Sequence, residues 1–535
     1  MRPRSLRSLF PLLSFPLLLL VSLSPIRSYD AFWHLATGRW ILEHRALPST
    51  DPFALASDPI PWHNGQWLFQ ILLEALFRAG GEAAMSVMRA VVVAILFLWL
   101  LRRSTAVASF PAAVILCSIA FAGADHRLGV RPELFAIVLT AMAVSLALDA
   151  LTPRRVFVLT LLTIVWINVH PSALLAPVIA SIGLMGCLIG GARSRADLRM
   201  PLAAVALTTA ALIVNPWGWR AIVDPLRLTA LASGSSFVNL EWLPSSPRIF
   251  PLLYLAIAGG VVFLLAEWRA RDEREEADFR LRASLAARGL FFLLFTVLAI
   301  RWVRGQGYFF VTLPLLLAPA AAQWKSRVLP VAAATTAIAA LLIIPMRRGI
   351  GLGADPSLFP VAAVRQLEAT GLRGNIFNAD QFGGYLIWKL GERRVLTDGR
   401  NELYRTFLEE MKAAREDSRK WNALFRKYDL TLAVEEFREG SVDAVNGITG
   451  AVEKLPPSEV YFPRHQWALV GFDDVAMIFA RRDAYPPETI AALEYRLLVP
   501  EVPGIRSREA GGEIRRARAR GAEGNRLRMM ESLVE

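Results

Sequence analysis

Cysteine is almost missing from the sequence: only Cys117 and Cys187 occur in 535 residues, and both lie inside apolar runs. The sequence therefore supports neither a disulfide framework nor a thiolate metal site, and both residues are interpreted as small core side chains. A Walker loop, a strand followed by GxGxxG, a kinase signature and a serine-hydrolase elbow are also lacking. Nucleotide-driven transport and cofactor redox chemistry have no support, so any reaction must use an already activated substrate.

Hydrophobic residues are abundant instead, at 54% of the chain with a mean hydropathy of +0.41. Before about residue 346, apolar runs of roughly 16 to 21 residues alternate with short arginine-bearing gaps, which predicts about eleven transmembrane helices. The first is expected from about Leu9 to Ile26, as an uncleaved helix. The others centre near residues 92, 114, 143, 162, 182, 207, 258, 295, 314 and 337. We expect an α-helical polytopic membrane domain over 1–346, an α/β domain over 347–500 and a charged tail over 501–535.

The formal net charge of +13 would suggest nucleic-acid binding in a soluble protein. Here the arginines fall mostly between apolar runs, which indicates membrane topology and contact with lipid headgroups, with no nucleic-acid partner. One set of gaps is consistently basic: Arg102 with Arg103, Arg154 with Arg155, Arg193 to Arg199, Arg269 to Arg288, and Lys325 with Arg327. The positive-inside rule predicts that these gaps and the N-terminus are cytoplasmic. With an odd number of spans, the C-terminal domain is expected outside, which at a bacterial inner membrane is the periplasm.

The opposite gaps collect histidine and tryptophan, and the first of them, at about residues 27–82, is the longest. Asp30 stands beside Phe32, Trp33 and His34, where a carboxylate can act as a base or hold a divalent cation such as Mg²⁺ or Mn²⁺. The alternative is that Asp30 caps a helix. Asp51 is the best second carboxylate, although Asp-Pro favours a turn.

Other candidates lie on the same face. Arginine forks suit a phosphate group, although each could instead extend toward the headgroups: Arg127, Arg131, Arg301 and Arg304. The histidines lack the HxxxH or HExxH spacing of a zinc site and stand as isolated polar candidates: His34, His63, His126 and His170. Glu241 is a further acidic candidate.

Several segments carry a family resemblance. YDAFWHLATGRWILEHRALPSTDPF resembles the first external loop of a bacterial branch of the GT-C membrane glycosyltransferase superfamily, which includes protein mannosyltransferases and oligosaccharyltransferases. NPWGWR, EWLPSSP, RWVRGQGYFF, NIFNADQFGGYLIWKL and VLTDGRNELY are similar to its other recurrent blocks, so the similarity covers about residues 5–485. The resemblance implies a polyprenyl-phosphate sugar as donor and an acidic residue of the first external loop as base or metal ligand. Asp30 matches that residue by position, whereas Ser28 and Tyr29 stand where the family often has a second acid.

The C-terminal part alternates predicted helices and strands, which favours an α/β layer. Helices are expected in PVAAVRQLEATG, in FGGYLIWKLG and, as one or two helices, between Glu402 and Tyr428; strands are expected in GNIFN and RRVLTD. QWALVGFDDVAMIFARR predicts a hairpin. Asp398 and Arg400 end a predicted strand, as binding residues or as a turn with an internal ion pair. The tail is expected to be a solvated helix or partly disordered.

Together with these patterns, the resemblance implies a membrane glycosyltransferase that moves a sugar from a polyprenyl-phosphate donor to a glycan, lipid or protein acceptor on the outer face. Asp30 would take the acceptor proton, and Arg301 and Arg304 would stabilise the leaving phosphate. A non-catalytic protein that binds lipid-linked glycan is the main alternative. A transporter or flippase is a second alternative, but the sequence shows no convincing internal repeat.

Overall fold

The computed structural model describes residues 15–192, 194–232, 240–272, 279–324, 326–391, 394–415, 417–445, 449–501, 504–505 and 507–534. The chain forms two compact units that do not follow its order. The bundle unit comprises Met1–Ser28 and His63–Gly353, and the α/β unit comprises Tyr29–Trp62 and Ala354–Glu535. Much of the expected first external loop therefore belongs to the same unit as the C-terminal segment.

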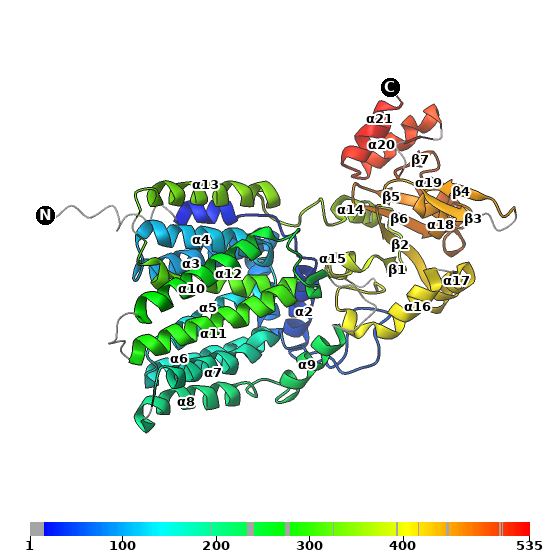
Figure 1. The fold of residues 1–535 in the computed structure, drawn as a ribbon. Coiled ribbons are helices and arrows are strands. Elements are labelled where there is room, and N and C mark those ends of the chain that lie inside the picture. The colour runs from blue at the N-terminus through cyan, green and yellow to red at the C-terminus, as the bar shows by residue number, and fades with distance from the viewer. Residues whose placement is uncertain are drawn as a thin grey trace. The chain divides into compact units, whose positions relative to one another are not determined.

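The bundle unit consists of helices that run alongside one another (Figure 1). They are α3 (Trp67–Thr105), α4 (Phe110–Ala124), α5 (Pro132–Leu148), α6 (Pro153–Val169), α7 (Leu175–Ile189), α8 (Arg195–Ala211), α10 (Pro251–Asp272), α11 (Phe279–Arg301), α12 (Gln306–Ala321) and α13 (Leu329–Arg348), with α9 (Arg220–Ala232) between α8 and α10. Each of the ten predicted apolar centres falls inside one of them. Of the expected first helix, residues 15–22 are helical and residues 1–14 lie outside the described part.

Within the described ranges, five segments are long and apolar enough to cross a membrane, which makes this a multi-pass membrane protein. They are Trp67–Thr105, Pro171–Ile189, Pro251–Ala270, Phe279–Arg301 and Leu329–Arg348. Of the other bundle helices, α4, α5, α6, α8 and α12 have 15 to 17 residues, and α9 has 13. At a rise of about 1.5 Å per residue they fall short of a hydrocarbon core of about 30 Å. The total of about eleven spans stays a prediction.

The segment expected to form the first external loop, residues 27–82, is helical over much of its length. It contains α2 (Asp30–His44) and the first turns of α3. α3 is interrupted at Gly80 and Gly81, where Gly81 has φ +61°. Residues that carry a side chain rarely adopt this backbone conformation. The glycine pair therefore allows the helix to change direction before its apolar part begins.

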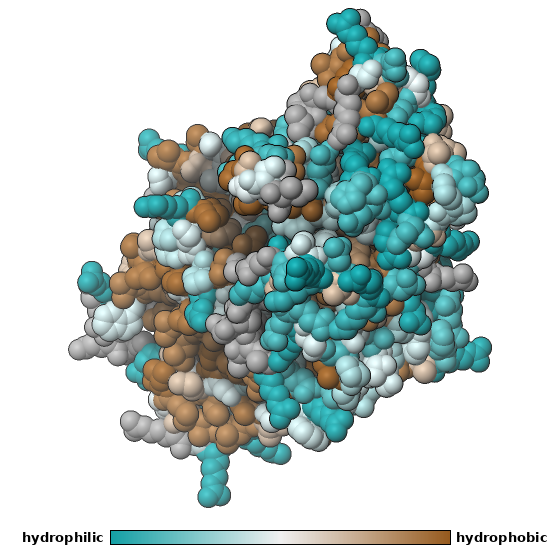
Figure 2. Space-filling model, turned by 90° about the vertical axis from the view of Figure 1, so that its right-hand side faces the viewer, coloured by the Kyte–Doolittle hydropathy of each residue, from teal (hydrophilic) through white to brown (hydrophobic). Residues whose placement is uncertain are grey.

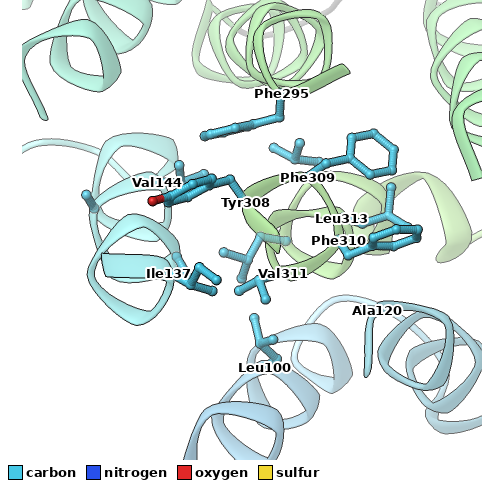
Figure 3. Packing of buried hydrophobic residues seen from close by; sticks show 14 of the residues in the cluster. Leu100, Ala120, Ile137, Val144, Phe295, Tyr308, Phe309, Phe310, Val311 and Leu313 are labelled. Atoms are coloured by element: carbon cyan, nitrogen blue, oxygen red, sulfur yellow. The ribbon is translucent and has the colours of Figure 1, made fainter. Parts of the chain in front are cut away.

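α12 occupies the centre of the bundle core (Figure 3). Its consecutive residues Tyr308, Phe309, Phe310 and Val311 are all buried, so the helix is apolar on every side. Gly123 of α4 makes room for one of these rings, because a Cβ there would lie 2.4 Å from Phe310. This close approach explains a glycine in the middle of an apolar helix.

α7 and α11 meet along a seam of small residues. Gly186 and Gly190 are spaced as GxxxG, and a Cβ on Gly186 would lie 2.8 Å from the Ala287 Cβ. A Cβ on Gly190 would lie 2.6 Å from the Ala283 backbone nitrogen. Close backbone packing of this kind associates helices in lipid, where no hydrophobic effect drives them together.

The bundle unit contains two buried charge clusters, of which the first differs from the sequence interpretation and the second was not predicted. Arg288, expected in a cytoplasmic gap, lies within α11 and forms a bidentate ion pair with Glu267 of α10 at 2.6 and 2.7 Å. The correction follows from the pairing, since a paired charge can lie in a helix interior. Asp125 is bound by Arg89 of α3 and Arg348 of α13, at 3.2 and 2.6 Å. In the sequence, the position of Arg89 inside the apolar run of α3 was the available sign of a buried ion pair.

The α/β unit has a four-stranded sheet in the order β1-β2-β6-β5. β1 (Asn375–Asn378) is parallel to β2 (Leu430–Glu436), and β6 (Ala476–Arg481) is antiparallel to both β2 and β5 (Trp467–Phe472). The predicted hairpin is thus β5 and β6. α14 (Val361–Thr370), α15 (Asp380–Leu390), α16 (Arg405–Arg415) and α17 (Ser418–Lys427) match the predicted helices. Two-stranded ribbons are formed by β3 (Val442–Val445) with β4 (Val452–Leu455) and by β7 (Leu498–Val499) with β8 (Gly504–Ile505).

Two expectations for this unit need correction. In the described part of RRVLTD, residues 394–398, the pairing is limited to isolated bridges from Val395 to Ala54 and Ile376, because the following residues turn at once. The tail is helical, as α20 (Gly511–Ala519) and α21 (Asn525–Ser532), but it is not simply solvated. Ile514, Leu527 and Met530 are buried in the core of this unit, so the apolar positions among the charges are a packing face.

Surface hydropathy separates the polar and apolar parts of the molecule. Figure 2 shows hydrophobic residues gathered in one area of the displayed face and hydrophilic residues over much of the rest. Large apolar side chains are more than half exposed on α10 and α13, including Leu255, Val262, Val331 and Leu342. Such surfaces suit contact with lipid.

Candidate functional site

Asp30 is the first residue of α2, and its carboxylate is held by neighbouring groups. The N-cap is Tyr29, with no capping side-chain hydrogen bond, so Asp30 lies in the first turn and is not a cap. The Trp33 indole Nε1 donates to Asp30 Oδ1 at 3.1 Å. A Cβ on Gly399 would lie 3.1 Å from the same oxygen, so the absence of a side chain there lets the chain pass close to the carboxylate. The carboxylate is oriented as a positioned base would be.

His34 lies on the same helix but is 2% exposed. Its ring packs against the Trp33 ring, with centroids 3.6 Å apart and the two planes inclined by 34°. The histidine therefore supports the tryptophan that holds Asp30. A direct part in catalysis stays a prediction.

Asp51, Asp398 and Arg400 come together, although almost 350 residues separate the first from the others. Arg400 Nη2 donates to Asp51 Oδ1 at 2.9 Å, and Arg400 Nε donates to Asp398 Oδ1 at 2.9 Å. The three side chains are at most 2% exposed. Burial opposes the charge of Arg400, but Asp398, Tyr404 and Asp51 raise its pKa well above the ordinary value. We call these residues the Arg400 cluster.

Both predicted turns are present in the Arg400 cluster. Asp398 Oδ1 also accepts from the Arg400 backbone nitrogen, so the Asp398 to Arg400 turn contains its own ion pair. Asp51 accepts from the backbone nitrogens of Phe53 and Ala54. The guanidinium lies over the rings of Trp33, Phe53 and Trp62, at 5.3, 5.6 and 4.6 Å. Since Trp33 also binds Asp30, the cluster can position the candidate base.

Glu402 was not singled out in the sequence. Burial raises its pKa, and the negative charges of Asp398 and Asp30 raise it further, against the pull of Arg400. A carboxyl two residues after the Asp398 to Arg400 turn was the available signal. Among the described residues, no group of three or more histidine, cysteine, aspartate or glutamate side chains could hold a metal ion.

In the bundle unit, Arg127 and Arg131 share two glutamates. Arg127 Nη1 and Arg131 Nη1 bind Glu241 Oε1 at 2.9 and 2.6 Å. Arg127 Nη2 and Arg131 Nη2 bind Glu133 Oε2 at 2.5 and 2.9 Å. Burial raises the pKa of Glu241, but Arg131 and Arg127 hold it well below the usual range. Glu133 was missed in the sequence, although it stands in the first turn of an apolar helix directly after Arg131 and Pro132.

We call the group of Arg127, Arg131, Glu133 and Glu241 the arginine pair site. Arg304 and His170 lie near it. The Arg304 guanidinium lies 4.5 Å from the Trp242 ring centroid and acts electrostatically on Glu241. Burial and the charge of Arg304 lower the pKa of His170 to about 3, so its ring is neutral. The Ser172 backbone nitrogen donates to His170 Nδ1 at 3.0 Å. His170 therefore supplies a neutral ring beside the arginines.

The remaining candidates, Arg301 and His63, have other contacts. Arg301 is exposed, and its guanidinium carbon lies 5.4 Å from the Trp302 ring centroid. This arrangement is typical of an arginine at a lipid interface. His63 Nδ1 contacts Asp224 Oδ2 at 2.5 Å. Asp30 and His34 belong to the α/β unit, whereas Arg301 and Arg304 belong to the bundle unit. Their gathering around one cavity stays a prediction.

Three solved structures of the Archaeoglobus fulgidus oligosaccharyltransferase have a similar fold. The apo form matches with a TM-score of 0.55 at 11% identity, over 84% of this chain and 75% of the other. The structure with zinc and sulfate matches with a TM-score of 0.51 at 12% identity, over 98% and 84%. The structure tethered to an acceptor peptide with the NVT sequon matches with a TM-score of 0.50 at 12% identity, over 84% and 74%. No protein-family model and no curated protein matches the sequence. At this identity the likeness shows the fold alone: the chain has a fold similar to that of the Archaeoglobus fulgidus oligosaccharyltransferase.

Proposed function

We propose that this protein is a membrane glycosyltransferase that transfers a sugar from a polyprenyl-phosphate donor to an acceptor on the extracytoplasmic face. The single observation that carries the proposal is the orientation of the Asp30 carboxylate at the start of α2 by Trp33, in a chain with this fold. A carboxylate held in place can accept a proton from an acceptor hydroxyl or amide as the new bond forms.

The proposed reaction needs two kinds of group. Asp30 takes the proton of the acceptor, whose oxygen or nitrogen attacks the sugar carbon while the bond from that carbon to the phosphate oxygen breaks. The leaving phosphate gains negative charge, which Arg127, Arg131, Arg301 and Arg304 are proposed to stabilise. Of these, Arg304 and the arginine pair site have the better support, because Arg127 and Arg131 are buried and converge on one carboxylate.

A divalent cation has less support than a base at Asp30. The described residues supply no group of three ligands, and Asp30 Oδ1 already accepts from Trp33. We therefore assign no step to a metal.

The test is transfer by purified wild-type protein in lipid nanodiscs. Radiolabelled polyprenyl-phosphate sugars are supplied with a panel of peptide, glycan and lipid acceptors, and donor binding is measured in parallel. We expect labelled product from at least one pair. Donor binding without product across the panel would contradict the enzyme and favour a non-catalytic protein that binds lipid-linked glycan. The specific observation behind that alternative is the lack of a second acid beside Asp30, at Ser28 and Tyr29.

A further inference from the structure

Glu241 holds an unusual position in the arginine pair site. Its two oxygens receive hydrogen bonds from two arginines, two from Arg127 at 2.9 and 3.2 Å and one from Arg131 at 2.6 Å. Planar guanidinium groups bind carboxylates and phosphates by the same paired geometry. The carboxylate of Glu241 therefore fills a place that an oxygen-rich anion could take.

The two glutamates of the site differ in how they are held. The Glu133 side chain is 3% exposed and belongs to α5, whereas the Glu241 side chain is 32% exposed. Glu241 lies on the short helix η3 (Leu240–Trp242), none of whose residues is buried. Backbone bonds fix the chain just after it, from Val303 to the Leu243 carbonyl and from Ser245 to the Ile300 carbonyl. A rotation of the Glu241 side chain alone could vacate the site while this backbone stays in place.

The charges of the site also favour an exchange. Arg127, Arg131 and Arg304 supply three positive charges, Glu133 and Glu241 supply two negative charges, and His170 is neutral. Without Glu241 the net charge of these groups would be 3 − 1 = +2. Because Arg127 and Arg131 are 4% and 13% exposed, this charge is poorly screened by water and requires an anion.

We propose that Glu241 is an internal occupant of an anion site and that the phosphate ester of a ligand displaces it from Arg127 and Arg131. The choice of ligand rests on the proposed function. Because Glu241 occupies the arginines for part of the time, the apparent association constant for phosphate equals the intrinsic constant multiplied by the fraction of molecules in which the site is vacant. When Glu241 leaves, Arg127 and Arg131 keep their ion pairs with Glu133, and the phosphate takes only the place that Glu241 vacates.

The test compares ligand affinity in two matched variants. Glu241→Gln removes the internal anion. Asp149→Asn is the control, because Asp149 also binds two arginines, Arg103 and Arg155, at 3.0 and 3.2 Å and is 33% exposed. Farnesyl phosphate binding is followed by calorimetry in an uncharged detergent. We expect Glu241→Gln to bind at least about tenfold more tightly than wild type, as for a site that Glu241 fills about nine-tenths of the time. The Asp149→Asn variant should show wild-type affinity, because its arginines are well exposed and screened.

Further arms identify the source of the phosphate and guard against misfolding. Glu241→Ala should give the same gain, and adding Arg131→Gln to either variant should abolish it. The same titrations use phosphatidylglycerol and inorganic phosphate. A gain for farnesyl phosphate assigns the site to the lipid-linked donor, and a gain for phosphatidylglycerol alone assigns it to a phospholipid headgroup. Unchanged affinity for all three ligands in folded variants would overturn the proposal. If the wild type transfers sugar but Glu241→Gln shows no gain in ligand affinity, the exchange is rejected and the proposed function stands. If Glu241→Gln gains affinity but the wild type transfers no sugar, only the proposed function is rejected.

Discussion

Arg400 Nη2 donates a hydrogen bond to Asp51 Oδ1 at 2.9 Å, which ties the segment after α2 to the turn before α16. Both side chains are at most 2% exposed. Removal of one partner from a buried ion pair leaves an uncompensated charge and destabilises a protein by about 3–5 kcal/mol. The contact therefore fixes the segment that directly follows α2, the helix that carries Asp30 and Trp33.

Arg400→Met should lower the melting temperature strongly, because it leaves both Asp51 and Asp398 buried without their cation. The measurement is thermal unfolding of the full chain in detergent, followed by tryptophan fluorescence, since Trp33 and Trp62 flank the guanidinium. Arg365→Met is the control, because Arg365 pairs with Glu523 at the surface, where both side chains are more than half exposed. Equal melting temperatures for the two variants would contradict a structural role for the Arg400 cluster.

The sequence predicted the helices and the hairpin well because their signals are local. Apolar runs such as that of α12 determine where a helix lies, and alternating apolar arms determine β5 and β6. The Asp51 to Arg400 pair had no such signal. Each residue was a candidate, but their contact depends on a chain path that joins positions 349 residues apart.

Charges near apolar runs were the main source of error. Arg288 was assigned to a gap because arginine beside an apolar run usually marks a helix end, and its partner Glu267 was not paired with it. Glu133 was missed for a similar reason, since an acidic residue in the first turn of a helix is common. A search for matching opposite charges on neighbouring helices, inside the apolar runs as well as at their ends, would have found both.

A second prediction concerns the α7 and α11 seam. Gly186→Val should destabilise the protein, because a Cβ there would lie 2.8 Å from a carbonyl oxygen and an alanine Cβ of α11. Gly259→Val in α10 is the matched control, since a Cβ at that position meets nothing within 4 Å. Melting temperatures should fall by several degrees for Gly186→Val and much less for Gly259→Val. An equal or larger loss for the control would show that close packing of α7 against α11 does not set the effect.

A third prediction concerns Glu435 on β2. Burial raises its pKa to about 7, against the opposing charges of Arg438 and Arg415. Between pH 4.5 and 7 the folded protein thus keeps a proton that the unfolded chain has lost, so stability falls as pH rises through this window. The slope from one carboxyl is at most about 1.4 kcal/mol per pH unit.

The measurement is the melting temperature of wild type and Glu435→Gln across that range. The advantage of the variant should grow from pH 4.5 to 7. Glu436→Gln, at the neighbouring side chain that is 44% exposed, controls for loss of a negative charge. A difference between Glu435→Gln and wild type that stays constant with pH would exclude the linkage.

A fourth prediction concerns orientation. With Cys117 and Cys187 replaced by alanine, Ser441→Cys and Asp58→Cys should react with an impermeant maleimide added outside intact cells. Arg154→Cys should react only after permeabilisation, because the basic gaps are expected to be cytoplasmic. Labelling of Ser441→Cys only in permeabilised cells would reverse the proposed topology.

The most direct measurement of the central claim is sugar transfer by Asp30→Asn. Asparagine keeps an oxygen that can accept from Trp33 but cannot take a proton from the acceptor. If Asp30 is the base, single-turnover transfer from a polyprenyl-phosphate sugar should fall about 100-fold or more, with donor affinity and melting temperature unchanged. Asp58→Asn, in the same segment of the α/β unit, should transfer at the wild-type rate. Transfer by Asp30→Asn at the wild-type rate would contradict the account.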